Sequence, residues 1–399
     1  MAHIVYTIEC PLVARDVDRY GINFLLNRNN KVTVVDVSDI TLPMLSHDRR
    51  EVVSSEDISI HTFQTIGSLH HVKPIFETAD LIINFVGISH FTPENLPLHR
   101  LVTQSKKPYV FAFTNPYPGW SRYRGEEGML LDRVLDISRR VGDLKLVNTL
   151  MARTPKLLLG VRSADYMIVG GRSCVNYGRL AGRSTHYIRA HAMDYENFRS
   201  EEINSPRQTN TAVFIDEYLP YHPDLAHMGV GAPMDPDKYY NCLREFFALV
   251  EKICHLEVVI AACPRADYSD KPNIFGNRKI KYNSTARLVA QSRLVIAHRS
   301  TAINYAVLFR KPIMLSATQE IYDHNSQTPF LRGFSRALKL PLNFIDDPKT
   351  IKFDNIFNFD EAVYERYIED FIKQSGSEEA PLWQIVVDAI NSHSSNIKL

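Results

Sequence analysis

The stretch RLVIAHRSTAINYAVLFRKPIMLSAT, residues 293–318, decides the fold. An apolar, β-branched run ends at His298, the polar triplet Arg299-Ser300-Thr301 follows, and an apolar helical pattern continues to about Arg310. Lys311-Pro312 then introduces a second apolar run. Runs that are apolar throughout, rather than alternating, are typical of parallel strands covered on both faces. The stretch therefore predicts a strand, a helix and a second strand of a parallel sheet.

Similar apolar runs recur along the chain, with helical patterns between them, and this alternation predicts two Rossmann-like doubly wound α/β domains. The runs cover residues 3–8, 31–37, 81–88, 109–114, 166–171, 211–216 and 256–262. The polar stretch FRSEEINSPRQTN, near residues 200–211, has no periodic pattern and predicts a linker. We expect domains at 1–205 and 206–350, followed by C-terminal helices at 351–399 from the patterns 360–373 and 380–390.

Composition excludes several classes of protein. The 399 residues carry 46 Lys and Arg against 45 Asp and Glu, a net charge of +1, and no basic block that would suit a nucleic-acid binder. The five cysteines are scattered and never spaced CxxC, which argues against a disulfide framework or a zinc cluster and favours a reducing compartment. No signal peptide and no run of about 18 apolar residues is evident, so we expect a soluble or peripheral protein in the cytoplasm.

Two strand ends in the second half predict a phosphate site. Ser300 and Thr301 stand where a helix is expected to begin, and helix-start N–H groups attract anions. Arg265, in the loop CPRADY after another strand, can clamp a phosphate with its fork of donors. We include His298 and Arg299 in this site. The simpler alternatives are that Ser300 only caps a helix, that His298 only ends a strand, and that Arg265 lies in a surface turn.

A third strand end carries Asp216 and Glu217, and the loop after it contains His222. Carboxylates and a nearby histidine can transfer protons, but adjacent residues of an extended backbone point in opposite directions. At most one of Asp216 and Glu217 is therefore expected in a site. A metal site from His222, Asp224 and His227 has weak spacing, so we predict no metal. Asp235-Pro236-Asp237 is interpreted as a helix cap with Pro at its first position.

Two further helix starts follow strands of the first half. Arg15, Asp16 and Arg19 follow the first strand, and His191 and Asp194 follow the strand near residue 188. We take Asp16 and Asp194 as the candidate catalytic carboxylates. For either one alone, a role as a helix cap is at least as good an interpretation.

Together these residues resemble a GT-B-fold glycosyltransferase of bacterial surface polysaccharide synthesis, such as capsule or O-antigen. The resemblance rests on IECPLVARDVDRYGINFLL, HAMDYENF, FIDEYLPYHPD, CPRADY, HRSTAINYAVLFRKPI and YERYIEDFIK. It extends loosely to sialyltransferases and Kdo transferases, in which a His-Pro pair and a Ser-Ser or Ser-Thr pair bind the donor phosphate. Ser300-Thr301 matches the second pair, whereas Cys263-Pro264-Arg265 stands where the first is expected.

The resemblance implies two domains facing a cleft, with C-terminal helices packing back across them. It also implies a nucleotide-sugar donor on the C-terminal half, a glycan or lipid-linked acceptor on the N-terminal half, and no metal or other cofactor. Nucleic acid is not expected as a partner, and the oligomeric state and peripheral association with the inner face of the cell membrane stay open. Two alternatives also stay open: a nucleotide-sugar epimerase of the same fold, and a non-catalytic glycan- or nucleotide-binding module.

Overall fold

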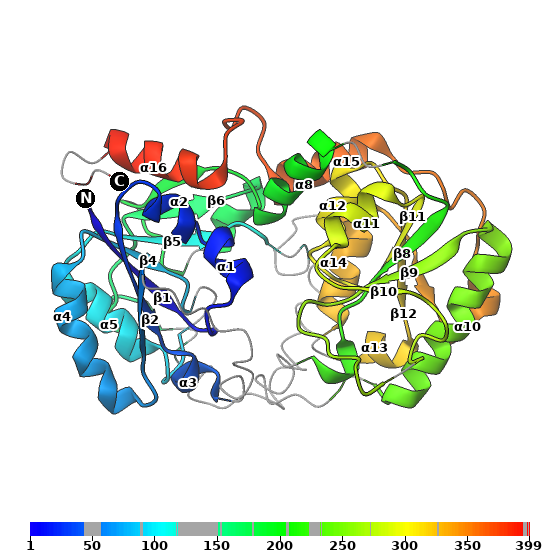
Figure 1. Ribbon diagram of the computed structural model, residues 1–399, viewed down its shortest axis with the longest axis horizontal. Coiled ribbons are helices and arrows are strands. Elements are labelled where there is room, and N and C mark those ends of the chain that lie inside the picture. Colours follow the sequence, from blue (N-terminus) through cyan, green and yellow to red (C-terminus); the bar gives the residue numbers. More distant parts are fainter. Residues whose placement is uncertain are drawn as a thin grey trace. The chain divides into compact units, whose positions relative to one another are not determined.

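The computed structural model describes residues 1–43, 57–87, 91–116, 118, 151, 154–177, 179–204, 207–222, 232, 234–271, 273–324, 327–393, 397 and 399. The chain forms two compact units (Figure 1). The first comprises Met1–Thr114, Gly125–His191 and Gly376–Leu399, and the second comprises Asn115–Arg124 and Ala192–Ser375. The last segment of the chain thus belongs to the first unit.

The described part of the first unit contains a seven-stranded parallel sheet in the order β3-β2-β1-β4-β5-β6-β7. Its strands are β1 His3–Ile8, β2 Lys31–Asp36, β3 Ile58–Thr62, β4 Leu81–Asn84, β5 Tyr109–Phe113, β6 Tyr166–Val169 and β7 His186–Arg189. Every residue of β4, β5 and β6 is buried, as expected for central parallel strands covered on both faces.

Helices cover both faces of this sheet. The helices α4 Val72–Thr78 and α5 Leu96–Ser105 lie on one face, and α1 Ala14–Arg19 and α2 Ile22–Leu26 lie on the other (Figure 1). The short elements α3 Ser38–Thr41, η2 Ile66–His71 and η3 Arg172–Tyr177 connect strands.

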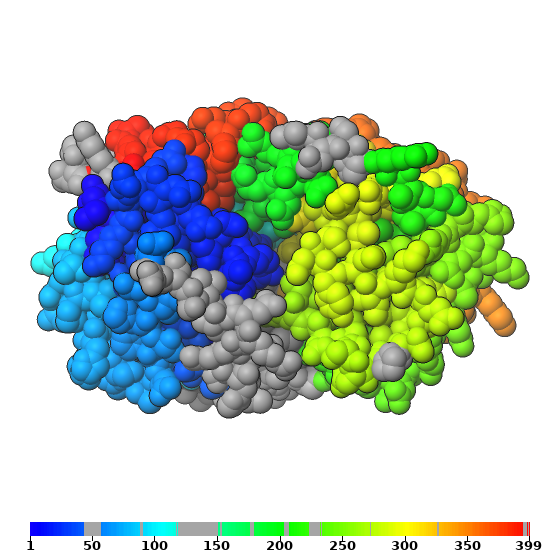
Figure 2. Space-filling view, viewed as in Figure 1, coloured from blue at the N-terminus to red at the C-terminus, as the bar shows by residue number. Residues whose placement is uncertain are grey.

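The final helix, α16 Leu382–His393, lies against α1 and α2 of the first unit, where it is red beside blue in the space-filling view (Figure 2). Trp383 Nε1 donates to the carbonyl of Arg19 at 3.0 Å. Gly21, with φ +72°, begins α2 directly under the indole ring, so close that a Cβ there would stand 2.2 Å from Trp383 Cδ2. The contact fixes α16 on this unit.

The described part of the second unit contains a six-stranded parallel sheet in the order β10-β9-β8-β11-β12-β13. Its strands are β8 Thr211–Ile215, β9 Glu257–Ala261, β10 Ile280–Lys281, β11 Leu294–Ala297, β12 Ile313–Ala317 and β13 Leu342–Phe344. Alternate residues of β8 belong to two different cores: Ala212 and Phe214 pack with helix α10 Pro236–Cys254, and Val213 and Ile215 pack on the opposite face.

The opposite face is covered by α8 Met193–Asn204, α11 Thr285–Gln291, α12 Ile303–Leu308 and α15 Glu361–Tyr367, which continues as a π-helical turn over Ile368–Ile372. The remaining elements are η4 Leu219–Tyr221, α13 Gln319–Asp323, α14 Thr328–Leu338 and η5 Pro348–Thr350. Within the described part of the chain, no helix is long and apolar enough to cross a membrane.

The predicted strands are confirmed, whereas the sequence pattern does not predict the edge strands β3, β10 and β13. These strands are short or partly exposed, so they lack the apolar run of a central strand. The linker predicted near residues 200–211 is wrong over its first part, because α8 extends through residues 200–204. This helix has hardly any apolar periodicity, so its sequence does not show a helical pattern. Both predicted C-terminal helices are present.

We predict that Gly21→Ala destabilises the protein by more than about 3 kcal/mol, since Ala meets both an unfavourable positive φ and the indole of Trp383. Gly376→Ala is the matched control, because Gly376 has φ +79° but no atom lies within 4 Å of the place where its Cβ would stand. The control should cost only about 1 kcal/mol, the backbone part alone. Chemical unfolding of both variants measures the difference, and equal losses would show that the Trp383 contact contributes nothing.

Candidate functional site

In the second unit, polar side chains gather at the carboxyl ends of neighbouring strands β8 and β11. Glu217 follows β8, and Arg299 follows β11. Glu217 Oε1 accepts from the Arg299 backbone N–H at 2.7 Å, and Glu217 Oε2 lies 3.7 Å from Arg299 Nε. The guanidinium carbon of Arg299 lies 5.2 Å from the centre of the Phe330 ring on α14. The carboxylate thereby joins the two strand ends and orients the arginine.

Asp216 joins β8 to β9 from the other side of the backbone. Its carboxylate is buried and accepts from Tyr218 N at 2.9 Å, Cys263 N at 3.2 Å and Tyr268 Oη at 2.8 Å. Burial raises the pKa of Asp216 to about 6, although these three donors favour its ionised form. Asp216 and Glu217 thus make separate sets of contacts. The buried carboxylate of Asp216 joins the loop after β8 to the loop after β9.

His298 is fully buried, with both ring nitrogens engaged inside the unit. Its Nδ1 lies 2.6 Å from the carbonyl oxygen of Ser316, so Nδ1 carries the proton, and Nε2 accepts from Tyr239 Oη at 2.8 Å. Burial lowers the pKa of His298, which favours this neutral form. Neither ring nitrogen is therefore free for the predicted contact with a donor phosphate, and the residue instead joins β11 to β12 and α10.

Ser300 and Thr301 do not cap the following helix, so the simpler alternative, in which Ser300 only caps a helix, is wrong. The helix α12 begins at Ile303 with Ala302 as its N-cap and has no side-chain cap. Ser300 Oγ instead accepts from Ala302 N at 3.2 Å, and the carbonyls of Ser300 and Thr301 accept from Ile303 N and Asn304 N. The two hydroxyl residues form a partly exposed turn after β11, next to Arg299.

The other predicted residues of this half occupy loops. Arg265 is partly exposed in the loop after β9, on the same edge of the sheet as Arg299, and His222 follows η4. Asp224 and His227 lie outside the described residues. Among the described residues, no three His, Cys, Asp or Glu side chains are arranged to hold a metal ion. Asp235 caps α10 as predicted, with its carboxylate accepting from Lys238 N at 2.8 Å.

Asp194 lies in the first turn of α8 within a polar network of the second unit. Its Oδ2 accepts from Asn115 Nδ2 at 2.7 Å and from Asn304 Nδ2 at 3.0 Å, and its Oδ1 accepts from Tyr305 Oη at 3.3 Å. Tyr367 Oη donates to Asn304 Oδ1 at 3.1 Å and so orients that amide. With both oxygens engaged, Asp194 ties α8 to α12.

In the first unit, Arg15, Asp16 and Arg19 belong to α1, as predicted. Asp16 is buried, and its Oδ1 accepts from Arg15 Nε at 3.0 Å and from the terminal nitrogen Nη2 at 2.9 Å. The carbonyl of Arg19 binds Trp383. His191 is buried, and its Nε2 lies 3.2 Å from the carbonyl oxygen of Ala380. These contacts fix α1 and the C-terminal segment.

A carboxylate not singled out from the sequence, Glu9, is the first residue after β1. Its Oε2 accepts from Gly87 N at 2.9 Å in the loop after the adjacent strand β4. Gly87 has φ +59°, and a Cβ there would stand 2.6 Å from His99 Nε2, so a glycine is required. Burial raises the pKa of Glu9 to about 7, against the lowering effect of the Gly87 hydrogen bond. Its position directly after the first predicted strand is the signal that could have identified it.

No protein-family model and no curated protein sequence matches the chain. Solved structures do resemble it. S. aureus MnaA, in a co-structure with UDP, has a TM-score of 0.50 and 12% identity over 98% of this chain and 97% of that chain. Acinetobacter baumannii MurG has a TM-score of 0.48 and 9% identity over 98% and 100%. The H444N variant of the wall teichoic acid polymerase TagF has a TM-score of 0.49 and 10% identity over 98% and 88%.

At such identities the likeness is one of fold alone. Together with the two parallel sheets and the return of the C-terminal helix to the first unit, it confirms the predicted class: two Rossmann-like domains of the GT-B type. The similarity extends over nearly the full length of both chains, so it covers both domains.

The Asp216 contacts give a test at the carboxyl end of β8. Tyr268→Phe removes a donor to the ionised carboxylate and should raise the pKa of Asp216 above about 6. Because the folded pKa lies above the ordinary value of 3.8, Asp216 opposes folding increasingly as the pH rises through this interval. The stability deficit of the variant should therefore be about 2 kcal/mol at pH 8 and smaller at pH 4.

Unfolding curves at the two pH values check this expectation. The matched control is Tyr240→Phe, whose hydroxyl lies 3.5 Å from Tyr268 Oη. A deficit that is the same at pH 4 and pH 8 would mean that Tyr268 acts by packing alone.

Proposed function

We propose that the protein is a glycosyltransferase that uses a nucleotide-sugar donor in the synthesis of bacterial surface polysaccharide, at the inner face of the cell membrane. The observation that carries this proposal is Glu9, a carboxylate with a pKa of about 7 at the carboxyl end of a central strand. A general base is most effective when its pKa lies near the working pH. The fold supports the proposal, and S. aureus MnaA, which shares it, has been solved with UDP.

We assign donor binding to the second unit. Ligands of open α/β sheets bind outside the carboxyl ends of strands, where Arg299, the Ser300-Thr301 turn and Arg265 lie. Arginines suit phosphate oxygens because their planar fork of donors matches them. Glu217 fixes the orientation of Arg299. His298, the residue before Arg299, anchors the same loop through its hydrogen bond with Tyr239. This assignment does not depend on a helix cap.

We assign acceptor activation to Glu9 of the first unit. In an inverting transfer, the acceptor hydroxyl loses its proton to Glu9 as its oxygen forms a bond to the anomeric carbon. The bond from that carbon to the donor phosphate oxygen breaks, and the nucleotide leaves with the electron pair. The arginines and the turn hydroxyls would stabilise the charge that develops on the phosphate.

Glu9 replaces Asp16 and Asp194 in this scheme because it has the better environment for a base. Asp16 is paired with the Arg15 guanidinium, and Asp194 accepts from three side chains. These contacts leave less of either carboxylate available to an acceptor hydroxyl. We propose positioning roles for both.

We predict that Ser300→Ala combined with Thr301→Ala weakens the binding of the preferred nucleotide by about tenfold or more, because two hydroxyl donors are lost. Calorimetric titration with UDP, GDP and CMP measures the effect. Ser284→Ala is the matched control: this serine also precedes a short helix, α11, but its hydroxyl donates to the carbonyl of Tyr282. Unchanged nucleotide affinity in the double variant would remove the phosphate site.

We predict that kcat/KM rises with pH and levels off above about 7, as Glu9 loses its proton. Glu9→Gln should lower turnover by roughly 10² to 10⁴-fold while nucleotide affinity stays unchanged, since the nucleotide site is assigned to the other unit. Asp16→Asn and Asp194→Asn serve as comparisons and should retain the pH profile. Full activity of Glu9→Gln would refute the base assignment.

The same assay separates the alternatives. Purified protein is incubated with nucleotide sugars, first without and then with glycan acceptors. Interconversion of donors without acceptor would identify an epimerase, and nucleotide binding without turnover on any acceptor would identify a binding module. Either result would overturn the transferase proposal.

A further inference from the structure

The first unit contains a cavity of about 240 Å³ beside its edge strand β3, at the amino ends of β1 and β2. His3 and Lys31 are the first residues of β1 and β2 and are register partners. Thr33 of β2 is the register partner of Ser59 of β3. Side chains two residues apart in a strand lie on the same face. One face of the sheet therefore carries five polar residues, and all five line the cavity: His3, Lys31, Thr33, Ser59 and His61.

The same face becomes apolar farther along the strands. Val5 and Val35 pack there in the core of the unit with Phe76 of α4. Pro74 and Ile75 of α4 line the cavity opposite the polar strand residues. The cavity thus has one apolar wall, from the helix, and one polar wall, from the sheet.

His3 and Thr33 form the fixed part of the polar wall. The His3 Nδ1 atom lies 3.1 Å from the carbonyl oxygen of Thr78. Since a carbonyl oxygen can only accept, Nδ1 carries the proton, and Nε2 accepts from Thr33 Oγ1 at 2.9 Å. Both ring nitrogens of His3 are therefore engaged. This leaves the imidazole unable to bind a metal ion, so the cavity is not suited to a cation.

The other three polar side chains keep their donors available. Lys31, Ser59 and His61 are exposed, and in the part of the chain that the structure describes their side chains form no hydrogen bond or ion pair. No carboxylate side chain is among the described residues that line the cavity. Asp80, which is close to His3, accepts from the His3 backbone N–H at 2.7 Å and does not line it. The cavity therefore offers donors and a positive charge.

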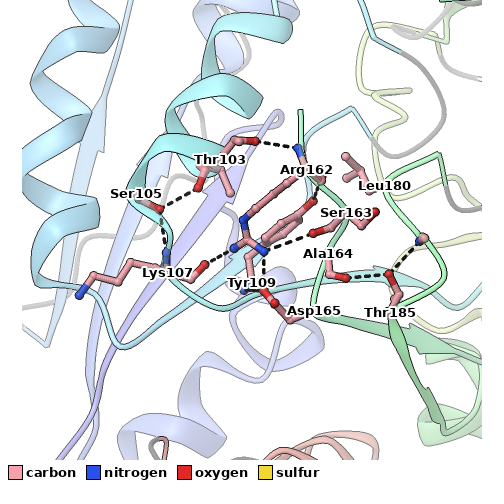
Figure 3. Close-up of polar contacts among 12 residues, drawn as sticks. Thr103, Ser105, Lys107, Tyr109, Arg162, Ser163, Ala164, Asp165, Leu180 and Thr185 are labelled. Carbon is pink, nitrogen blue, oxygen red and sulfur yellow. Dashed lines mark hydrogen bonds and ion pairs between the residues drawn. The ribbon is translucent and has the colours of Figure 1, made fainter. Parts of the chain in front are cut away.

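Arg162 of the same unit is a cation with a structural role and provides a contrast (Figure 3). Its guanidinium donates to Asp165 Oδ2 at 2.8 Å, to the carbonyl of Ser163 at 3.2 Å and to the carbonyl of Lys107. It also lies over the Tyr109 ring, 4.5 Å from its centre. The charge and the terminal nitrogens of Arg162 are thus already used. The ammonium group of Lys31 has no such partner among the described residues, which leaves it available to a ligand.

From these observations we propose that the cavity binds a small phosphate anion, either inorganic phosphate or the phosphate group of a monosaccharide phosphate. Lys31 supplies the charge, and Ser59 and His61 donate hydrogen bonds to the phosphate oxygens. Pockets for drug-sized ligands measure roughly 300 to 1,000 Å³, so a cavity of about 240 Å³ suits a smaller ligand than a whole nucleotide sugar. The apolar wall of Pro74 and Ile75 can pack against a sugar ring.

This site is separate from the proposed transferase chemistry. His3 begins β1 and Glu9 follows its last residue, so the cavity and the proposed base lie at opposite ends of a strand of six residues, about 20 Å apart. Arg299 and the Ser300-Thr301 turn belong to the other unit. The cavity can therefore bind its anion whether or not the protein transfers a sugar.

The test is calorimetric titration of the full chain with inorganic phosphate and, separately, with glucose 6-phosphate. Lys31→Gln should weaken the binding of both about tenfold or more, because it removes the ammonium group from the cavity. Lys252→Gln is the matched control: this exposed lysine of α10 belongs to the second unit, and its loss changes the net charge equally. The control should keep the wild-type affinity.

Ser59→Ala combined with His61→Gln provides an independent arm and should also weaken phosphate binding about tenfold. Thermal unfolding checks that each variant is folded. Wild-type affinity for phosphate in both Lys31→Gln and the Ser59, His61 double variant would overturn the proposal, as would the absence of phosphate binding by the wild type.

Two comparisons identify the ligand and the place where it binds. Tighter binding of glucose 6-phosphate than of inorganic phosphate would support a sugar phosphate, and equal affinities would support the free anion. Ser300→Ala combined with Thr301→Ala should keep the phosphate binding that Lys31→Gln weakens. Loss of phosphate binding in that double variant but not in Lys31→Gln would place the anion in the second unit and refute the site.

Discussion

Both sheets are parallel and covered by helices on both faces, and this constraint decides where polar chemistry can occur. Alternate residues of β8 pack into two separate cores, so an unpaired polar side chain within the strand would be buried at high cost. A polar side chain within a strand therefore needs a partner, as Thr7 has in Asn84, and the polar groups of the candidate site follow the last strand residue. Glu9 after β1, Asp216 and Glu217 after β8, and His298 and Arg299 after β11 all obey this rule.

The carboxylates at these strand ends differ in what surrounds them, and this difference separates their roles. Among the described residues, Asp216 receives three hydrogen bonds and pairs with no cation, and burial still raises its pKa. Glu217 has an arginine partner. Among the described residues, Glu9 accepts from the Gly87 amide and has no charged partner that shifts its pKa. Burial raises the pKa of Glu9 to about 7. The first carboxylate joins loops, the second orients a cation, and the third suits proton transfer.

Much of the fold could be predicted from the sequence because central parallel strands must be apolar. Edge strands such as β10 escape this requirement, and α8 carries so little apolar periodicity that its sequence resembles a linker. The strand ends were also predictable, but side-chain contacts were not. Ser300 forms a turn rather than a helix cap. Both ring nitrogens of His298 are hydrogen-bonded, one to Tyr239 and the other to Ser316, and neither partner is near His298 in sequence.

The pKa of Glu9 also bears on why the base and the phosphate-binding groups would belong to separately folded units. A guanidinium a few ångströms from a carboxylate lowers the pKa of the carboxyl, which weakens it as a base. Among the described residues of the first unit, burial raises the pKa of Glu9 and the Gly87 amide lowers it. The second unit orients Arg299 through Glu217 with contacts complete in that unit. The pKa of Glu9 therefore depends on contacts at the strand ends of the first sheet, and the orientation of Arg299 depends on contacts at the strand ends of the second. Each of these two properties can change without the other.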